Sequence, residues 1–504
     1  MPDIIIDGKK VTFTGKANII EMARSVGVEI PAFCYHPALS VSGNCRMCMV
    51  EVGMPAKDKS GAIQKDEKGD TVISFMPKLQ PACYQEPVDG MVIKTDSEKV
   101  IETRKRILEF LLINHPLDCP VCDQAGECVL QDYSFQYGFT QSRFLETKRT
   151  YEKTFFSDVI TPELNRCIHC DRCSRFTKEI ANDFSFTRTW RGNGTELAAL
   201  PDMKIEHNYQ GNMVDICPVG ALTLTDFRFK SRVWFLKNSE GICTSCGKGC
   251  NVVYAIDRNN KILRIKPRFN KNINNYWMCD FGRLRYSVFN EKRLTKFLIQ
   301  GKETSIESAV EHVQKQIVSN SRVGIIASAA ESLEGCNALA DLAKNFIKSE
   351  HIDYRVHSAQ MKEDTSLKNG EVLMVNDPYP NSMGAKKAHL LPGPNGLSAE
   401  MILKNPEQLD ILLVVIDDKL LENQVVVNAL KKAGKVILFS PWDLEWFGEV
   451  EAVLPLQVSL EQRGTFININ GVEQKFEIVK SSEKNSRSMI EYVSMIMQAA
   501  TAVK

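Results

Sequence analysis

Cysteine is the residue type whose distribution in this sequence points to chemistry. The chain has 16 cysteines, and all but Cys336 lie between Cys34 and Cys279. Many are separated by two or three intervening residues, a spacing at which neighbouring thiolates can bind one metal centre. The first residues, MPDIIIDGKK, lack the pattern of an export signal, so we expect a reducing, cytoplasmic setting. The pattern therefore predicts metal ligands rather than disulfides.

The first set of thiols is Cys34-x10-Cys45-x2-Cys48-x34-Cys83. Three ligands on one loop and a distant fourth resemble the way plant-type ferredoxins hold a 2Fe-2S cluster, although the first interval is longer here. Gly43 and Asn44 allow a tight turn whose amides can point at cluster sulfurs. The alternative is a structural zinc site, although zinc usually favours paired knuckles.

The second set is His115-x3-Cys119-x2-Cys122-x5-Cys128, one imidazole with three thiols. Its spacing alone suits either zinc or an iron-sulfur cluster, and the neighbouring sets favour the cluster. A neutral imidazole in place of a thiolate makes a cluster less negative, which raises its reduction potential.

The third set, Cys167-x2-Cys170-x2-Cys173 with a remote Cys217, has the most specific spacing in the chain. Three cysteines at steps of three can bind one face of a cubane, and a distant Cys-Pro segment supplies the fourth ligand, as in bacterial 4Fe-4S ferredoxins. Zinc is the weaker alternative. His169 lies inside this loop, and we expect it beside the ligands or at the surface.

The fourth set is Cys243-x2-Cys246-x3-Cys250-x28-Cys279. Four thiols at this spacing suit a zinc site as well as a cluster. Cys336 belongs to none of the sets. It stands in the helical stretch LEGCNALADL, where we expect a small buried apolar side chain.

Short strands and helices must position the first two sets. A hairpin is predicted around Asp7 and Gly8, followed by a helix over residues 19–26 and strands at 49–52 and 91–93. This order suggests a small mixed β domain, with 57–70 as an exposed loop. Apolar residues at helical spacing over 97–114 predict a helix that ends before Pro116 and leads into the second set.

The later half of the chain has a different pattern. Short strands are expected around the fourth set from Val233 onward. Beyond about residue 293, buried strands at 323–327, 411–415 and 435–439 alternate with helices such as 333–347 and 423–432. This alternation predicts a doubly wound parallel sheet.

Composition excludes several classes of function. The 504 residues carry 63 basic and 62 acidic side chains, so no overall charge draws the chain to nucleic acid or a membrane. No apolar run approaches the ~20 residues of a membrane span. Gly192-Asn193-Gly194 lacks the third glycine of a dinucleotide fingerprint, and there is no P-loop, HExxH or GxSxG. We therefore expect an electron carrier with no catalytic residue and no nicotinamide or flavin of its own.

The order of these motifs resembles the large iron-sulfur subunit of bacterial respiratory NADH:quinone oxidoreductase (complex I). The resemblance covers residues 1 to about 290 and rests on CYHP with CRMC, HPLDCPVCDQAGEC, RCIHCDRCSRF with CPVGAL, and CTSCGKGC with YWMCDFGR. It implies one 2Fe-2S cluster on Cys34, Cys45, Cys48 and Cys83. It implies three 4Fe-4S clusters, on His115, Cys119, Cys122 and Cys128; on Cys167, Cys170, Cys173 and Cys217; and on Cys243, Cys246, Cys250 and Cys279. The last set matches an additional cubane of some bacterial members that lies off the main path, so we expect it to be structural.

The remaining residues resemble the molybdopterin-dependent oxidoreductase fold. The segments AVLP at 452–455 and GTFIN at 464–468 are similar to segments of that superfamily, although Arg463 replaces an acidic residue. About 210 residues are too few for its complete bis-pterin cleft. We therefore expect a degenerate, structural domain without molybdopterin.

The resemblance implies a multidomain α+β and α/β chain of five parts. These are a β-grasp 2Fe-2S ferredoxin-type domain at 1–96, a 4Fe-4S domain with one histidine and three cysteine ligands at 97–138, a 4Fe-4S ferredoxin-like domain at 139–232, a 4Fe-4S segment of molybdopterin-oxidoreductase type at 236–292, and a shortened molybdopterin-oxidoreductase-like α/β domain at 293–504.

The function implied by the resemblance is electron transfer inside a larger oxidoreductase. Electrons from NADH, delivered by FMN on a partner flavoprotein subunit, would pass through the clusters toward quinone, coupled in the whole complex to proton translocation. Peripheral-arm iron-sulfur subunits are further expected partners, and the expected place is the cytoplasmic side of the bacterial inner membrane, touching the membrane only through the complex. One alternative is the iron-sulfur subunit of a NAD-linked hydrogenase or formate dehydrogenase. A non-redox zinc scaffold is the alternative of another class.

Overall fold

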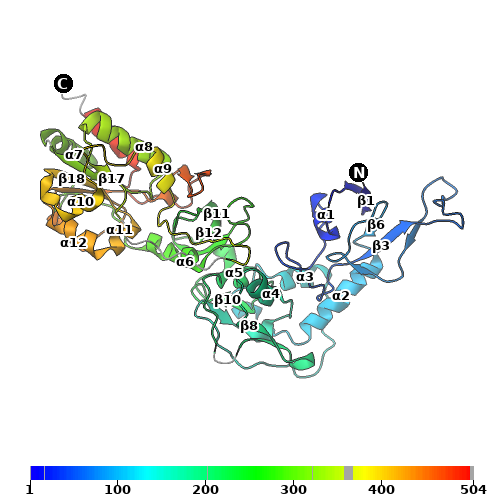
Figure 1. Ribbon diagram of the computed structural model, residues 1–504. Coiled ribbons are helices and arrows are strands. Elements are labelled where there is room, and N and C mark those ends of the chain that lie inside the picture. The colour runs from blue at the N-terminus through cyan, green and yellow to red at the C-terminus, as the bar shows by residue number, and fades with distance from the viewer. Residues whose placement is uncertain (1, 16, 201–202, 321, 357–366, 500–504) are drawn as a thin grey trace. The chain divides into compact units, whose positions relative to one another are not determined.

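The computed structural model describes the chain except for residues 1, 16, 201–202, 321, 357–366 and 500–504 (Figure 1). Contacts between Cα atoms divide it into two compact units. The first is Met1–Val233 with Leu367–Asn369, and the second is Trp234–Ser366 with Gly370–Lys504. The first three ligand sets therefore lie in one unit, and the fourth lies in the other.

The first unit begins with a six-stranded mixed sheet in the order β2-β1-β6-β3-β4, with β5 paired to β3. Strands β1 and β6 are parallel, and the other pairs are antiparallel. The bounds are β1 Asp3–Ile6, β2 Lys9–Thr12, β3 Met49–Pro55, β4 Ile73–Phe75, β5 Gln80–Pro81 and β6 Val92–Lys94.

Local signals explain these elements. Asp7 and Gly8 both have positive φ, 47° and 80°, which matches the twist of a two-residue hairpin between β1 and β2. Helix α1 (Ile19–Ser25) begins where the Asn18 side chain accepts a hydrogen bond from the Glu21 amide, and it buries its apolar face. Residues 57–70 are exposed. The small mixed β domain and its exposed loop are therefore confirmed.

Helices flank the loops that hold the second and third sets. Helix α2 (Glu98–Leu112) packs against α3 (Val129–Tyr137), which confirms the helix predicted for 97–114 (Figure 1). Next come α4 (Arg172–Glu179) and α5 (Gly211–Asp215). They pack among two antiparallel strand pairs, β7 (Ile160–Pro162) with β10 (Leu222–Leu224) and β8 (Phe186–Thr189) with β9 (Glu196–Ala199).

The second unit begins with a three-stranded antiparallel sheet that frames the fourth set. Its strands are β11 (Lys237–Ile242), β12 (Asn251–Ile256) and β13 (Ile262–Pro267), and helix α6 (Asp280–Leu284) follows.

A seven-stranded sheet in the order β15-β14-β20-β19-β18-β16-β17 forms the rest of this unit. The five strands from β20 to β17 are parallel, which confirms the predicted doubly wound sheet. Its edge differs, because a tight turn at Gln300 and Gly301 joins β14 to β15 and forces these two strands to pair antiparallel. Strand β14 also runs antiparallel to β20. The bounds are β14 Phe297–Ile299, β15 Lys302–Thr304, β16 Val323–Ile326, β17 Ile352–Asp353, β18 Ile411–Val415, β19 Val436–Ser440 and β20 Ala452–Pro455. A separate hairpin joins β21 (Gly464–Ile467) and β22 (Glu473–Phe476).

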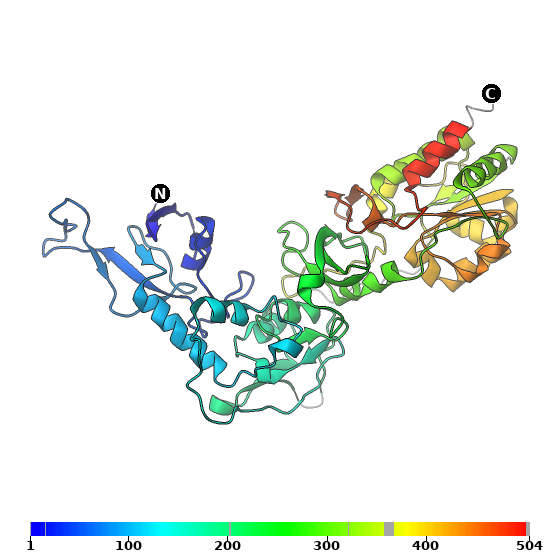
Figure 2. The ribbon, with the colours of Figure 1, turned by 180° about the vertical axis from the view of Figure 1, so that it is seen from behind.

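Helices cover both faces of the sheet (Figure 2). On one face are α7 (Ile306–Ser319), α8 (Leu333–Asp341), α9 (Ser382–Lys387) and α13 (Met489–Ala499), and on the other are α10 (Ala399–Lys404), α11 (Asp418–Glu422) and α12 (Gln424–Lys432). Along β18, Leu412 and Val414 face the second group, while Ile411, Leu413 and Val415 face the first. The helix predicted over 333–347 changes to a π-helical turn at Leu342–Ile347.

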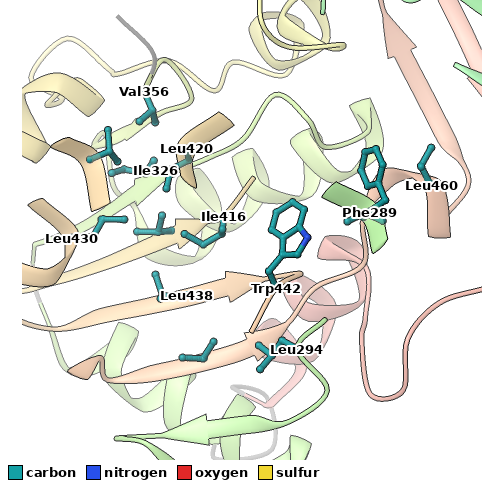
Figure 3. Packing of buried hydrophobic residues seen from close by; sticks show 14 of the residues in the cluster. Phe289, Leu294, Ile326, Val356, Ile416, Leu420, Leu430, Leu438, Trp442 and Leu460 are labelled. Carbon is teal, nitrogen blue, oxygen red and sulfur yellow. The ribbon is translucent and has the colours of Figure 1, made fainter. Parts of the chain in front are cut away.

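The core on the α10–α12 face also includes two thiols of the fourth ligand set. Cys243 and Cys250 belong to the same buried apolar cluster as Leu412 and Leu438 of the sheet. Figure 3 shows part of this cluster around Ile416, Leu438 and Trp442. Among the described residues, none of the helices combines the length and apolarity needed to cross a membrane.

Candidate metal centres

The four thiols of the first set lie in contact with one another. Cys34, Cys45 and Cys48 come from the loop between α1 and β3, and Cys83 follows β5. Hydrogen bonds from the thiols of Cys45 and Cys83 lower the pKa of the Cys34 thiol far below its usual range. A further thiol contact joins Cys83 to Cys48. The fold thus brings one remote and three local cysteines together.

Backbone amides of the same loop point at these sulfurs. The amides of Cys45 and Asn44 hydrogen-bond to the Cys34 thiol. Gly43 has a positive φ of 62°, which allows the sharp turn that aims them. Amides directed at sulfur stabilise negative charge there, whether on a thiolate or on a cluster.

The second set lies between α2 and α3. Cys119 is exposed, Cys122 is buried, and Cys128 stands directly before the first residue of α3. Burial raises the pKa of the Cys122 and Cys128 thiols, which also interact electrostatically with Cys119. Each of the three thiols is therefore within electrostatic range of the other two.

His115, the proposed fourth member of this set, has an unused ring nitrogen. Its Nδ1 is buried and has no hydrogen-bond partner among the described residues. Burial lowers the pKa of His115 to about 4, so the imidazole is neutral at pH 7. An unpaired buried polar atom is costly, and a neutral imidazole nitrogen is a common metal ligand. These two features are compatible with a ligand role for His115, and His169 shares them.

The third set surrounds a cavity. Cys167, Cys170, Cys173 and Cys217 all line it, together with apolar side chains such as Leu197 and Val219. Burial raises the pKa of all four thiols, to about 12 for Cys167 and about 11 for Cys170. Bound iron would offset this cost of ionisation, so the donor set suits a cluster.

His169 takes a supporting position in this loop, as expected. It has a positive φ of 52°, and its amide donates a hydrogen bond to the Cys167 sulfur at 3.3 Å. Its Nε2 lies 3.4 Å from the hydroxyl of Tyr151.

All four thiols of the fourth set are buried. Cys243 directly follows β11, and its amide donates to the Cys250 carbonyl at 2.8 Å. The Gly282 amide donates to the Cys279 sulfur at 3.3 Å. A Cβ atom on Gly282 would lie 2.9 Å from the Cys243 sulfur, so only glycine fits between these two thiols.

Cys336 is not a member of the four sets. It is fully buried in the apolar core that includes residues of α7 and α8. This position confirms the expectation of a small buried apolar side chain.

Side chains of α4 connect the loops of the first and third sets. Arg175 donates to the carbonyls of Cys34 and Ser40. Ser40 in turn donates to the carboxylate of Glu179 through its amide and hydroxyl, at 2.8 and 2.5 Å. The side-chain amide of Asn44 donates to the His169 carbonyl at 3.1 Å. These contacts hold the two loops at a fixed separation.

Sequence reasoning missed the residues that join neighbouring sets. Arg172 and Arg175 lie inside or beside the CDRC motif, but their partners in the first loop are more than 100 positions away. Gly220 follows Cys217 and lies against the Cys122 sulfur of the second set.

In the described part of the chain, no group of three or more His, Cys, Asp or Glu side chains has an arrangement that could hold a metal ion as it stands.

Three family models match the chain. The 2Fe-2S iron-sulfur cluster binding domain matches residues 3–98, the NADH-ubiquinone oxidoreductase-G iron-sulfur binding region matches 104–143, and the ferredoxin-like domain of NADH-quinone oxidoreductase subunit 3 matches 157–223. These models include all the residues of the first three sets.

Curated relatives agree with these matches. A NADH-quinone oxidoreductase subunit of Rickettsia conorii is 36% identical over 365 residues, which are 71% of this chain and 51% of the relative. The NADH-ubiquinone oxidoreductase 75 kDa subunit of Reclinomonas americana is 37% identical over 334 residues, 65% of this chain and 45% of the relative. The chain spans about half the length of the curated relatives it matches.

A solved chain of an NAD+-reducing [NiFe]-hydrogenase in the H2-reduced state is 23% identical. The match covers 46% of this chain and 91% of that chain, with a TM-score of 0.38, which is too low to support an argument about fold.

Fold, ligand sets and family models together define an iron-sulfur protein with 2Fe-2S and 4Fe-4S ferredoxin-type regions. Over about 70% of its length the chain is similar to iron-sulfur subunits of NADH-quinone and NADH-ubiquinone oxidoreductases.

Proposed function

We propose that this chain is the iron-sulfur electron-transfer subunit of a NADH:quinone oxidoreductase. It would take electrons that leave NADH through FMN on a partner flavoprotein and pass them toward quinone, and the whole complex would couple this transfer to proton translocation. The observation that carries the proposal is the third set, in which four thiols line one cavity among apolar side chains. Its place would be peripheral, on the cytoplasmic side of a bacterial inner membrane, next to other iron-sulfur subunits.

The ligand sets proposed from the sequence remain our assignment. Cys34, Cys45, Cys48 and Cys83 would hold a 2Fe-2S cluster. Three 4Fe-4S clusters would be held by His115, Cys119, Cys122 and Cys128; by Cys167, Cys170, Cys173 and Cys217; and by Cys243, Cys246, Cys250 and Cys279. When bound, these clusters supply one-electron redox chemistry.

The protein's own residues would determine how readily each site accepts charge. Amides of Asn44, Cys45 and Gly282 point at ligand sulfurs and favour the more negative state. Apolar side chains around the third set exclude water and disfavour added charge. The contacts of α4 with the first loop keep two of the sites at a fixed separation.

The domain assignments follow the same reasoning. We infer a β-grasp 2Fe-2S domain at 1–96 and two 4Fe-4S domains at 97–138 and 139–232. A 4Fe-4S segment of the molybdopterin-oxidoreductase type follows at 236–292. The last part is a shortened α/β domain of the same type, without a pterin, at 293–504. The doubly wound sheet supports the last part. The packing of Cys243 and Cys250 in its core supports a structural role for the fourth set.

Metal analysis combined with reduction tests this function. The anaerobically reconstituted chain should hold about fourteen iron atoms, from one 2Fe-2S and three 4Fe-4S clusters. NADH should reduce these clusters in the host complex and leave them oxidised in the isolated chain. Stoichiometric zinc without acid-labile sulfide would establish the scaffold alternative. Reduction by H2 or formate in the host complex would establish the hydrogenase or formate dehydrogenase alternative.

A further inference from the structure

Arg172 is a cation that reaches the first and third ligand sets at once. It is the first residue of α4 and stands directly before Cys173. Its Nη2 donates to the Tyr35 carbonyl at 2.6 Å, beside Cys34. Its Nη1 donates to the Ile216 carbonyl at 3.2 Å, beside Cys217. One guanidinium therefore contacts the backbone next to a ligand of each set.

The charge of Arg172 has no carboxylate partner among the described residues. Its hydrogen bonds go to carbonyls, and its buried Nε has no hydrogen-bond partner there. The opposite charge available to it comes from thiols: Cys170 and Cys217 in the third set, and Cys34 and Cys45 in the first. A guanidinium removed from water is costly unless negative charge compensates it. Once these thiols ionise as cluster ligands, the thiolates on either side would supply that compensation.

We propose that Arg172 is a shared positioning residue that raises the reduction potentials of both the first and the third cluster. The proposal rests on the proposed function, because it assumes that both thiol sets bind clusters.

The physical reason is the sign of the charge that reduction adds. Each one-electron reduction makes a cluster more negative by one charge. A fixed cation beside it stabilises the reduced form more than the oxidised form, and partial burial leaves this interaction poorly screened. Because Arg172 lies close to both sets, its loss should affect two clusters in one direction.

Redox-titrated EPR on the full reconstituted chain tests the proposal with three variants. Arg172→Gln removes the charge and keeps a hydrogen-bond donor. Arg172→Lys keeps the charge and loses the forked geometry. Lys178→Gln is the matched control, since it removes the same charge from an exposed position of the same helix. The 2Fe-2S signal reports on the first set, and the 4Fe-4S signal that Cys170→Ala abolishes reports on the third.

Arg172→Gln should lower both midpoints, changing the reduced-to-oxidised ratio at a fixed potential by about tenfold, or about 59 mV for a one-electron couple. Arg172→Lys should leave both midpoints near their wild-type values, and Lys178→Gln should shift neither midpoint. Unchanged midpoints in Arg172→Gln, or an equal shift in the lysine variant, would overturn the proposal.

If Arg172→Gln fails to bind iron, the Arg172→Lys variant decides whether the charge or the hydrogen bonds of Arg172 matter. Two clusters at wild-type potentials would support a role for the charge, and loss of either cluster would show that the hydrogen bonds are what the site needs. Wild-type protein without clusters would instead refute the proposed function.

Discussion

His115 differs from the other proposed ligands because it carries no negative charge. Its imidazole is neutral at pH 7, since burial lowers the pKa to about 4. We expect His115→Cys to keep a 4Fe-4S cluster and lower its midpoint, because a thiolate adds one negative charge that favours the oxidised form. We expect His115→Ala to make that cluster labile, because one iron is left open to exchange. Redox-titrated EPR measures both effects.

His169 provides the control for this prediction. It also has a buried Nδ1 without a partner among the described residues, and burial also lowers its pKa. Because His169 contacts the third set through its backbone amide, His169→Ala should leave the cluster content unchanged. An unshifted midpoint in His115→Cys would remove His115 from the ligand list.

At the scale of elements, the turn between Cys217 and β10 serves two ligand sets. Cys217 lines the cavity of the third set, and three residues later Gly220 lies against the second. A Cβ atom on Gly220 would lie 2.2 Å from the Cys122 sulfur, closer than two non-bonded atoms can approach. The turn must therefore have glycine for Cys122 to keep its position.

We expect Gly220→Ala to displace the Cys122 sulfur and to cost the second cluster, about four iron atoms per chain. Gly194→Ala is the matched control in the same unit, because nothing lies within 4 Å of its Cβ position and its φ is not positive. Iron and sulfide analysis of both variants measures the effect. Full iron content in Gly220→Ala would show that this turn can shift without disturbing the second set.

At the scale of the whole molecule, the fourth set depends on residues far along the chain. The Gly247 amide donates to the Asp377 carbonyl at 2.8 Å, and the Ile469 amide donates to the Gly247 carbonyl at 2.8 Å. Gln474 donates to the Gly249 carbonyl at 2.9 Å. The loop of the fourth set is thus held by segments that follow β17 and β21.

We therefore expect a chain truncated after residue 292 to lose the fourth cluster and keep the other three. Its iron content should fall from about fourteen to about ten atoms, the same as in a chain truncated after Val233. The second truncation follows the boundary between the compact units and is the control. A full complement of iron in the longer fragment would show that residues 236–292 hold their cluster independently.

Local features of this protein could be predicted from the sequence because they depend on residues close together in the chain. Helix α2 follows from apolar residues at helical spacing, and the hairpin at Asp7 and Gly8 follows from turn preference. The strands of the doubly wound sheet follow from short, continuous apolar runs such as Ile411–Val415. Each cysteine set could be recognised in the sequence because most of its members share one loop.

Only the tertiary structure decided which distant residues meet. It places Arg172 against Tyr35, Gly220 against Cys122, and two thiols of the fourth set in the core of the sheet. It also pairs β14 with the distant strand β20 in the antiparallel direction. None of these contacts has a local signature, because each depends on how separate elements pack once the chain has folded, and one sequence spacing is compatible with many such packings.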